Sequence, residues 1–120
     1  MKIETPFNRY KKNIYSQAGE DGVIEEILNR LEIDKHGERW CVEFGAWDGI
    51  HCSNTFALVE KGWNAVYIES DQKKYEDLLT TVKQYQNITP IEAMVARSSL
   101  DVNSLDSLLA KTSIPIDYDV

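Results

Sequence analysis

The sequence predicts an α/β fold with a doubly wound parallel sheet. Apolar, strand-like stretches at residues 40–44 and 65–68 alternate with segments of helical spacing. A turn that contains Gly45 and Gly49 follows the first strand directly, and an acidic residue, Glu69, follows the second. Strands that alternate with helices pair in parallel, because each helix carries the chain back to the starting edge of the sheet.

The first part of the chain predicts a surface segment followed by an amphipathic helix. Residues 1–15 are polar and mixed in charge, so we expect them to lie on the surface of one domain spanning residues 16–120. A helix is predicted over residues 20–31, where apolar residues recur every three or four positions. These apolar residues are Val23, Ile24, Ile27, Leu28 and Leu31.

Two further helices flank the second strand. The pattern predicts a helix over residues 53–61, which ends before Gly62, a residue suited to a helix C-cap. A second helix is predicted over residues 72–84, with Asp71 as its N-cap. With one helix before and one after the second strand, right-handed crossovers place that strand beside the first and the third strand outside it.

A third strand is predicted over residues 88–95, and a last short helix starts at Asn103 or Ser104. The strand contains Pro90, which has no amide hydrogen to donate to a ladder. We therefore expect the strand to begin after Pro90 or to lie at an edge of the sheet.

The last residues, 116–120, have the pattern of a fourth strand. In a doubly wound sheet this strand lies beside the first one, on the side away from the second. We therefore expect the chain to be the N-terminal portion of a longer domain, truncated after its third strand. A bare edge on the first strand would favour self-association through strand pairing.

Charge and composition exclude several classes of protein. The net charge of −7 and the pI near 4.8 argue against a nucleic-acid partner, because an acidic surface repels phosphates. The sequence contains neither a membrane-spanning stretch nor the apolar core of a signal peptide, so the expected location is cytoplasmic. Cys41 and Cys52 are expected to be reduced thiols, and no metal-binding cluster is predicted.

The residues that follow the strands predict a site for a nucleotide-type ligand. Gly45 allows the backbone to turn tightly and to approach a ligand, because it has no Cβ. Glu69 ends the next strand, where a carboxylate accepts hydrogen bonds from two ribose hydroxyls. Glu43 is either part of this ligand site or a strand-end carboxylate bonded to the amides of the turn.

Three motifs give the chain a resemblance to a known family. The motifs are YSQAGEDG at 15–22, VEFGAWDG at 42–49 and SNT at 53–55, followed by Glu69. In this order they resemble the Rossmann-like, cofactor-binding half of class I S-adenosylmethionine-dependent methyltransferases, and most closely the FkbM-type branch. The resemblance covers about residues 13–120. It implies a seven-stranded sheet and methylation of hydroxyl oxygens on small molecules, sugars, glycans or natural products.

The resemblance also implies the residues that hold the cofactor, S-adenosylmethionine. They are Gln17, Asp21, Glu43, Gly45, Ala46, Gly49, Glu69, Ser70 and Ala93. Glu43 would hold the ammonium group, Glu69 the ribose, and Ala93 the adenine. Asp21 has a second interpretation, because an acidic residue in the first turn of a helix also interacts favourably with the helix dipole. No catalytic residue is predicted within the chain.

Two other functions compete with methyl transfer. One is a nicotinamide-dependent oxidoreductase, which Trp47 disfavours because a bulky side chain obstructs the close approach of a pyrophosphate to the turn. The other is a non-catalytic Rossmann-like binding or assembly fragment. The acceptor-binding part of the family fold lies beyond Val120, so we expect this chain alone to have little activity.

Overall fold

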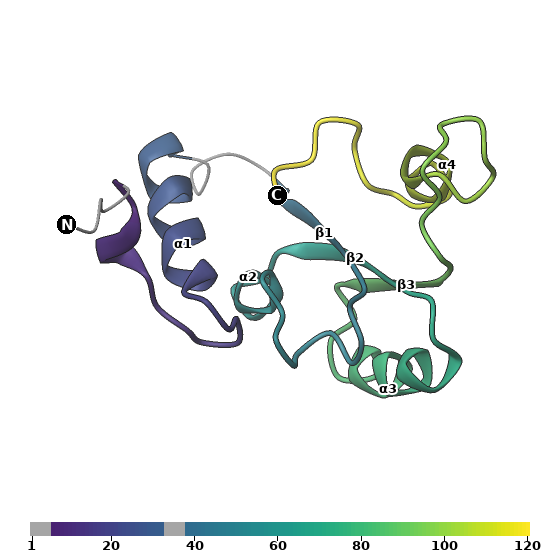
Figure 1. Ribbon diagram of the computed structural model, residues 1–120, viewed down its shortest axis with the longest axis horizontal. Coiled ribbons are helices and arrows are strands. Elements are labelled where there is room, and N and C mark those ends of the chain that lie inside the picture. Colours follow the sequence, from purple (N-terminus) through teal and green to yellow (C-terminus); the bar gives the residue numbers. More distant parts are fainter. Residues whose placement is uncertain (1–5, 33–37) are drawn as a thin grey trace.

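The described residues of a computed structural model, 6–32 and 38–120, build a sheet of three parallel strands (Figure 1). The strands are β1 (Trp40–Phe44), β2 (Asn64–Glu69) and β3 (Ile88–Glu92), in the order β1-β2-β3. The predicted α/β class, parallel pairing and strand order are therefore confirmed. Residues 1–5 of the expected surface segment lie outside the described residues.

The helices follow the predicted order. They are η1 (Asn8–Tyr10), α1 (Glu20–Leu31), α2 (Phe56–Glu60), α3 (Gln72–Val82) and α4 (Leu105–Leu109). The bounds of α1 match the prediction, whereas α2 begins three residues later than expected. Asp71 caps α3 as predicted, and its carboxylate accepts a 3.0 Å hydrogen bond from the Lys74 amide. Ser104 caps α4 in the same way through the Ser107 amide.

Both faces of β2 are buried, as expected for the central strand of a parallel sheet. On one face, Ala65 and Tyr67 pack with apolar residues of α1, α2 and α3. On the other face, Val66 and Ile68 pack with residues of α4. Figure 1 shows α3 and α4 on opposite sides of the strands. The chain thus changes face after β3, which is the connection expected of a doubly wound sheet.

β3 forms one edge of the sheet, and it includes Pro90 in register with Tyr67. Asn87 and Ala93 both bond to β2, through the Asn87 carbonyl and the Ala93 amide. The backbone amide and carbonyl groups of successive residues point to opposite sides of a strand. Those of the odd-numbered residues of β3 therefore point towards β2, and the backbone nitrogen of Pro90 points away from it. The expectation of an edge strand is confirmed. The strand ends at Glu92, three residues before the predicted end.

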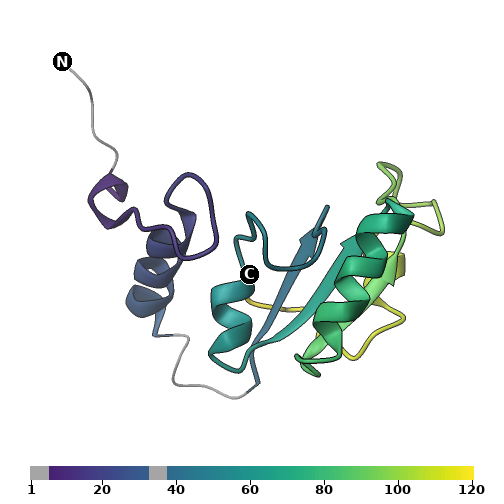
Figure 2. The same cartoon turned by 90° about the horizontal axis from the view of Figure 1, so that it is seen from below.

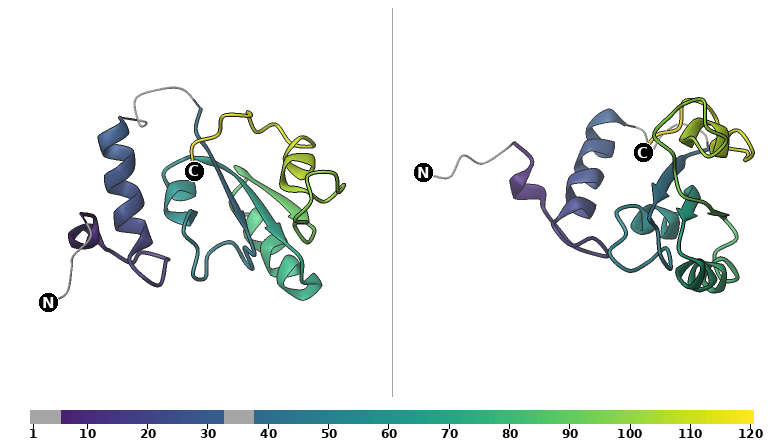
Figure 3. Two further views of the ribbon diagram at one scale, coloured as in Figure 1. Left: turned by 45° about the horizontal axis from the view of Figure 1, so that its top comes forward. Right: turned by 45° about the vertical axis from the view of Figure 1, so that its right-hand side comes forward.

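The edge of β1 is not bare, which corrects one expectation. The Val120 carbonyl accepts a 2.9 Å bond from the Val42 amide, and the Val120 amide donates to the Trp40 carbonyl at 3.4 Å. This pair of bonds has the pattern of parallel pairing, and the C-terminal residues lie beside β1 (Figures 1 and 3). Asp119 and Val120 therefore cover part of the edge that was expected to drive self-association.

Burial of the Cys41 thiol leads us to expect a loss of stability in alkaline solution. Cys41 is fully buried in β1, and burial raises its pKa from 9.0 to about 12. The protonated thiol is the form favoured by folding, so its contribution is complete below pH 9 and is lost as the pH rises towards 12. We expect urea denaturation at pH 8, 9.5 and 11 to show that the free energy of unfolding decreases less with pH in Cys41→Ala than in the parent. The two slopes of the free energy of unfolding against pH should differ by at most about 1.4 kcal/mol per pH unit. Parallel curves would contradict this burial.

Candidate functional site

A cavity of about 400 Å³ opens at the carboxyl ends of the three strands. Its lining residues are Phe44, Gly45, Ser70, Ala93, Met94, Val95, Ala96 and Arg97. Three of the predicted cofactor-binding residues, Gly45, Ser70 and Ala93, thus meet in one place. In open parallel sheets ligands bind at this edge, at the point where the strand order reverses, which here is beside β1 because Val120 pairs with its other side. We call this space the strand-end cavity.

The two glycines of the turn after β1 have different structural roles. Gly45 has a φ of +68°, which favours glycine, and a Cβ added there would meet no atom within 4 Å. Gly49 has a φ of +81°, but its added Cβ would lie 2.9 Å from the Tyr67 ring and 3.1 Å from Leu78. Gly45 therefore leaves open space beside the strand-end cavity, whereas Gly49 allows the turn to pack on the core.

Glu69 is buried and holds the backbone around the carboxyl end of β2. One carboxylate oxygen accepts a 2.8 Å bond from the Trp47 amide. The other accepts bonds from the amides of Ser70 at 2.8 Å and Asp71 at 3.0 Å. The carboxylate thus joins the turn after β1 to the segment after β2. It fixes the position of Ser70, which lines the strand-end cavity.

Glu43 binds the segment that precedes α2. Its carboxylate accepts hydrogen bonds from the Ser53 hydroxyl at 2.7 Å, the Thr55 hydroxyl at 2.8 Å and the Asn54 amide at 3.0 Å. Of the two interpretations of Glu43, the structure therefore shows local bonding to the loop. A carboxylate has about four acceptor positions, so these contacts leave room for a further donor.

Ala46 and Trp47 attach the turn to the neighbouring elements. The Ala46 amide donates to the Ile68 carbonyl at 3.1 Å, so it is already occupied within the fold. Trp47 has a φ of +52°, an uncommon conformation for a bulky residue. Its indole nitrogen donates to Asp77 of α3 at 3.1 Å, and the Lys74 ammonium lies 5.4 Å from the centre of the indole ring. These contacts offset the backbone cost of the turn.

Gln17 and Asp21 lie in the N-terminal segment and do not line the strand-end cavity. Asp21 is buried, and one of its oxygens accepts bonds from the amides of Ile14, Tyr15 and Ser16 at 2.7–2.8 Å. Burial opposes ionisation of Asp21, but these three amide bonds outweigh it and lower its pKa. Gln17 is exposed, and its carbonyl accepts a bond from the Asn13 side chain. The structure thus places Gln17 in a loop that the carboxylate of Asp21, in the first turn of α1, closes.

Several residues of the strand-end cavity were not predicted from the sequence as a site. Val95, Ala96 and Arg97 line it because β3 ends at Glu92 and the chain then runs past the ends of the other strands. Phe44 lines the cavity from β1 and is 60% exposed. Their position at or just beyond the strand ends is the sequence signal that identifies them, once the end of β3 is known.

Over the described ranges, no helix has both the length and the apolar character needed to cross a bilayer. Within the same residues, no group of three His, Cys, Asp or Glu side chains is arranged to hold a metal ion. Comparisons with protein-family models, with curated proteins and with solved structures found no match for this chain.

Proposed function

We propose that the chain binds S-adenosylmethionine and acts in a class I methyltransferase that methylates a hydroxyl group of a sugar, a glycan or another natural product. The observation that carries the proposal is the strand-end cavity, where Gly45, Ser70 and Ala93 meet beside Glu69. The pairing of Val120 with the other side of β1 supports the same proposal, because the strand order then reverses at β1, and ligands of open parallel sheets bind at such a point.

The apolar surfaces and the acceptor oxygens around the strand-end cavity suit the proposed cofactor. Phe44 and Met94 provide exposed apolar surface that suits a purine. The Glu69 oxygen that accepts one bond from Trp47 retains a lone pair for a ribose hydroxyl. Glu43 supplies a negative charge near the turn for an ammonium group. The open space next to Gly45 allows a ligand to pass close to the backbone without a steric clash.

When bound, S-adenosylmethionine would supply an electrophilic methyl group. Glu43 would hold the ammonium group of the cofactor, Glu69 its ribose and the segment at Ala93 its adenine, and the acceptor hydroxyl would lose its proton to water. The role of this chain in that reaction is to hold and orient the reactants, since proximity contributes much of the rate in such displacements. The same cavity suits a nicotinamide dinucleotide less well, because Trp47 stands in the turn that would approach a pyrophosphate.

The proposal predicts that S-adenosylhomocysteine binds with a Kd between about 1 μM and 0.2 mM, measured by calorimetry. NAD should give no comparable heat. Gly45→Ala should weaken binding about tenfold, because the added methyl group enters the open space beside the cavity. Gly62→Ala is the matched control: Gly62 also has a positive φ and an open surrounding, but it lies outside the cavity.

Two results would contradict the proposal. The first is the absence of heat for S-adenosylhomocysteine with a sample whose circular dichroism shows a folded protein. The second is an equal loss of affinity in Gly45→Ala and Gly62→Ala, which would trace the effect to backbone strain rather than to the cavity.

A further inference from the structure

A set of buried hydroxyl groups converges on the carboxylate of Glu43. The Ser53 and Thr55 hydroxyls both donate to its Oε2 atom, at 2.7 and 2.8 Å, and the Thr55 hydroxyl lies 2.8 Å from that of Tyr67. Figure 2 shows the segment between β1 and α2, residues 45–55, at the arrowhead end of the strands. We call the three hydroxyls of Ser53, Thr55 and Tyr67 the hydroxyl network.

The direction of each hydrogen bond in the network follows from the protons that its members have. A carboxylate only accepts hydrogen bonds, so the single proton of the Thr55 hydroxyl goes to Glu43. The Tyr67 hydroxyl must then donate to Thr55. Burial raises the pKa of Tyr67 above its ordinary value of 10.0, so this hydroxyl keeps the proton that it donates. The donors therefore run from Tyr67 through Thr55 to Glu43.

The Ser53 hydroxyl is fully occupied within the fold. It donates to Glu43 and accepts bonds from the amides of Thr55 at 3.2 Å and Phe56 at 3.0 Å. A hydroxyl has one proton and two acceptor positions, so Ser53 has no capacity left for a ligand. Its contact with Glu43 orients the carboxylate and fixes it to the start of α2.

One acceptor position of Glu43 remains, and the hydroxyl network decides where it lies. Oε2 accepts two hydrogen bonds, whereas Oε1 accepts one, from the Asn54 amide at 3.0 Å. A carboxylate has about two positions on each oxygen, so the remaining position is on Oε1. Rotation of the carboxylate would break both bonds to Oε2. The network therefore holds Oε1 in one orientation.

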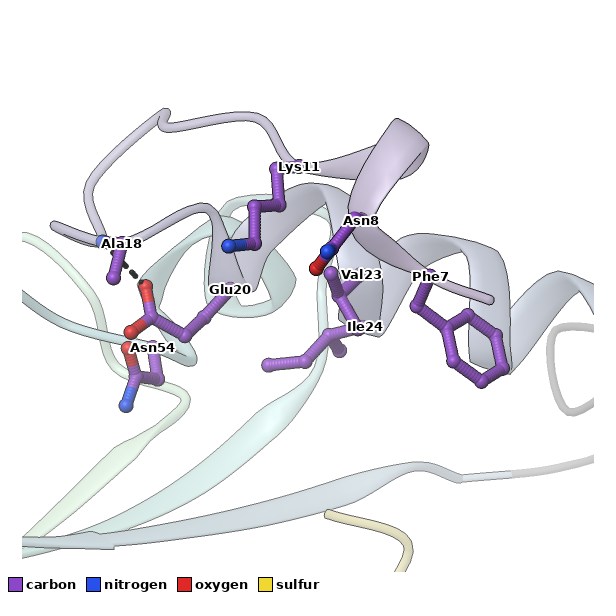
Figure 4. Close-up of a pocket in the computed structure, with 8 residues that line it drawn as sticks. All are labelled: Phe7, Asn8, Lys11, Ala18, Glu20, Val23, Ile24 and Asn54. Atoms are coloured by element: carbon purple, nitrogen blue, oxygen red, sulfur yellow. Dashed lines mark hydrogen bonds between the residues drawn. The ribbon is translucent and has the colours of Figure 1, made fainter. Parts of the chain in front are cut away.

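The contact between Asn54 and Glu43 comes from the backbone. The Asn54 side chain lines a separate cavity of about 330 Å³, together with Glu20 and Ile24 (Figure 4). This cavity shares no lining residue with the strand-end cavity. A substitution of the Asn54 side chain leaves the amide donor in place, so the orientation of Glu43 is tested through the hydroxyl network instead.

We propose that Thr55 is a positioning residue of the ligand site. With its proton directed by the contact with Tyr67, it holds Glu43 so that Oε1 receives the ammonium group of the ligand, and the site thereby selects ligands that carry this group. This inference rests on the proposed function, which places the ammonium group of the cofactor at Glu43. It goes further because it assigns selectivity to two residues outside the strand-end cavity. Hydrogen bonds between charged groups are about twice as strong as neutral ones, so the orientation of Oε1 affects affinity.

The test compares two ligands that differ in one group. S-adenosylhomocysteine carries the ammonium group, and its deamino analogue has hydrogen in place of the amino group. In calorimetry, the double variant Thr55→Val/Tyr67→Phe should raise the Kd of S-adenosylhomocysteine about tenfold, the effect of about one hydrogen bond. The Kd of the deamino analogue should stay within about twofold of that of the parent. Because both hydroxyls are replaced, neither is left buried without a partner, and the fold should survive.

Three further variants separate positioning from a general effect on the fold. Thr55→Ser keeps the hydroxyl and should keep the Kd values of the parent for both ligands. Tyr67→Phe alone leaves Thr55 bonded to Glu43, so the Kd of S-adenosylhomocysteine should lie between those of the parent and the double variant. Thr81→Val is the matched control, because it removes the hydroxyl of another buried threonine, which bonds to the Asp77 carbonyl within α3. Neither Kd should change in this control.

Several results would overturn the inference. An equal loss of affinity for the two ligands in the double variant would mean that the hydroxyl network serves only the fold. An unchanged Kd of S-adenosylhomocysteine in that variant would show that Thr55 does not position Glu43. A parent that binds both ligands equally well would refute the selection of an ammonium group and leave the cofactor proposal standing. A folded parent that binds neither ligand would refute the proposed function, and the positioning role with it.

Discussion

Replacing Gly49 with alanine is expected to lower the free energy of unfolding by about 2–5 kcal/mol. Part of this cost, about 1–2 kcal/mol, comes from placing a Cβ on a backbone with a φ of +81°. The remainder comes from overpacking, because the new methyl group would lie 2.9 Å from the Tyr67 ring and 3.1 Å from Leu78. Both neighbours are fully buried and have no space into which to move.

Gly62→Ala isolates the backbone contribution. Gly62 has a φ of +95°, but its added Cβ would meet no atom within 4 Å, so only about 1–2 kcal/mol should be lost. Urea denaturation followed by far-ultraviolet circular dichroism measures both variants on one scale. Equal losses in the two variants would mean that Gly49 does not pack against Tyr67 as described.

Replacing Glu69 with alanine is the second change with a large expected effect. It removes the acceptor for three backbone amides, those of Trp47, Ser70 and Asp71. Each unsatisfied, partly buried donor costs about 1–3 kcal/mol, and water that enters the gap recovers part of this. We therefore expect a loss of about 2–5 kcal/mol in the free energy of unfolding. Glu92→Ala is the control, because Glu92 pairs in register with Glu69 but is exposed, and its change should stay within about 0.5 kcal/mol.

The Glu69 variant also tests the ribose assignment under the methyltransferase proposal. S-adenosylhomocysteine should bind Glu69→Ala more weakly by about 1.5–3 kcal/mol. Calorimetry must be run at a temperature at which circular dichroism shows the variant to be folded, so that lost stability is not mistaken for lost affinity. Unchanged affinity in a folded sample would refute the ribose role and leave the structural role of Glu69 intact.

The order and type of the elements were predictable because each is encoded by a local pattern. The spacing of Val23, Ile24 and Leu28 gave the bounds of α1, and the apolar run at residues 40–44 gave those of β1. The start of α2 was wrong, because Ser53 and Thr55 direct their hydroxyls to Glu43 instead of joining the helix. That contact depends on a residue in another element, which local periodicity does not contain.

The candidate site was predictable in part for the same reason. Gly45, Ser70 and Ala93 each directly follow a strand, so an α/β sheet brings them together without further information. The cavity that Phe7, Glu20 and Asn54 line was not predicted, because it joins segments of the chain that share no pattern. Glu43 could not be assigned from the sequence, since a strand-end carboxylate has the same pattern whether it binds a ligand or a loop.

The position of Trp47 gives the turn an intrinsic optical label. Trp47 is 37% exposed, whereas Trp40 and Trp63 are 8% and 2% exposed. Acrylamide in solution should therefore quench the emission of Trp47 in preference to that of the other two indoles. The Trp47 amide and the Ser70 amide share the Glu69 carboxylate, so we expect a molecule that contacts Ser70 in the strand-end cavity to change the surroundings of the indole. Emission excited at the red edge of tryptophan absorption can thus follow ligand entry in real time, without any added dye.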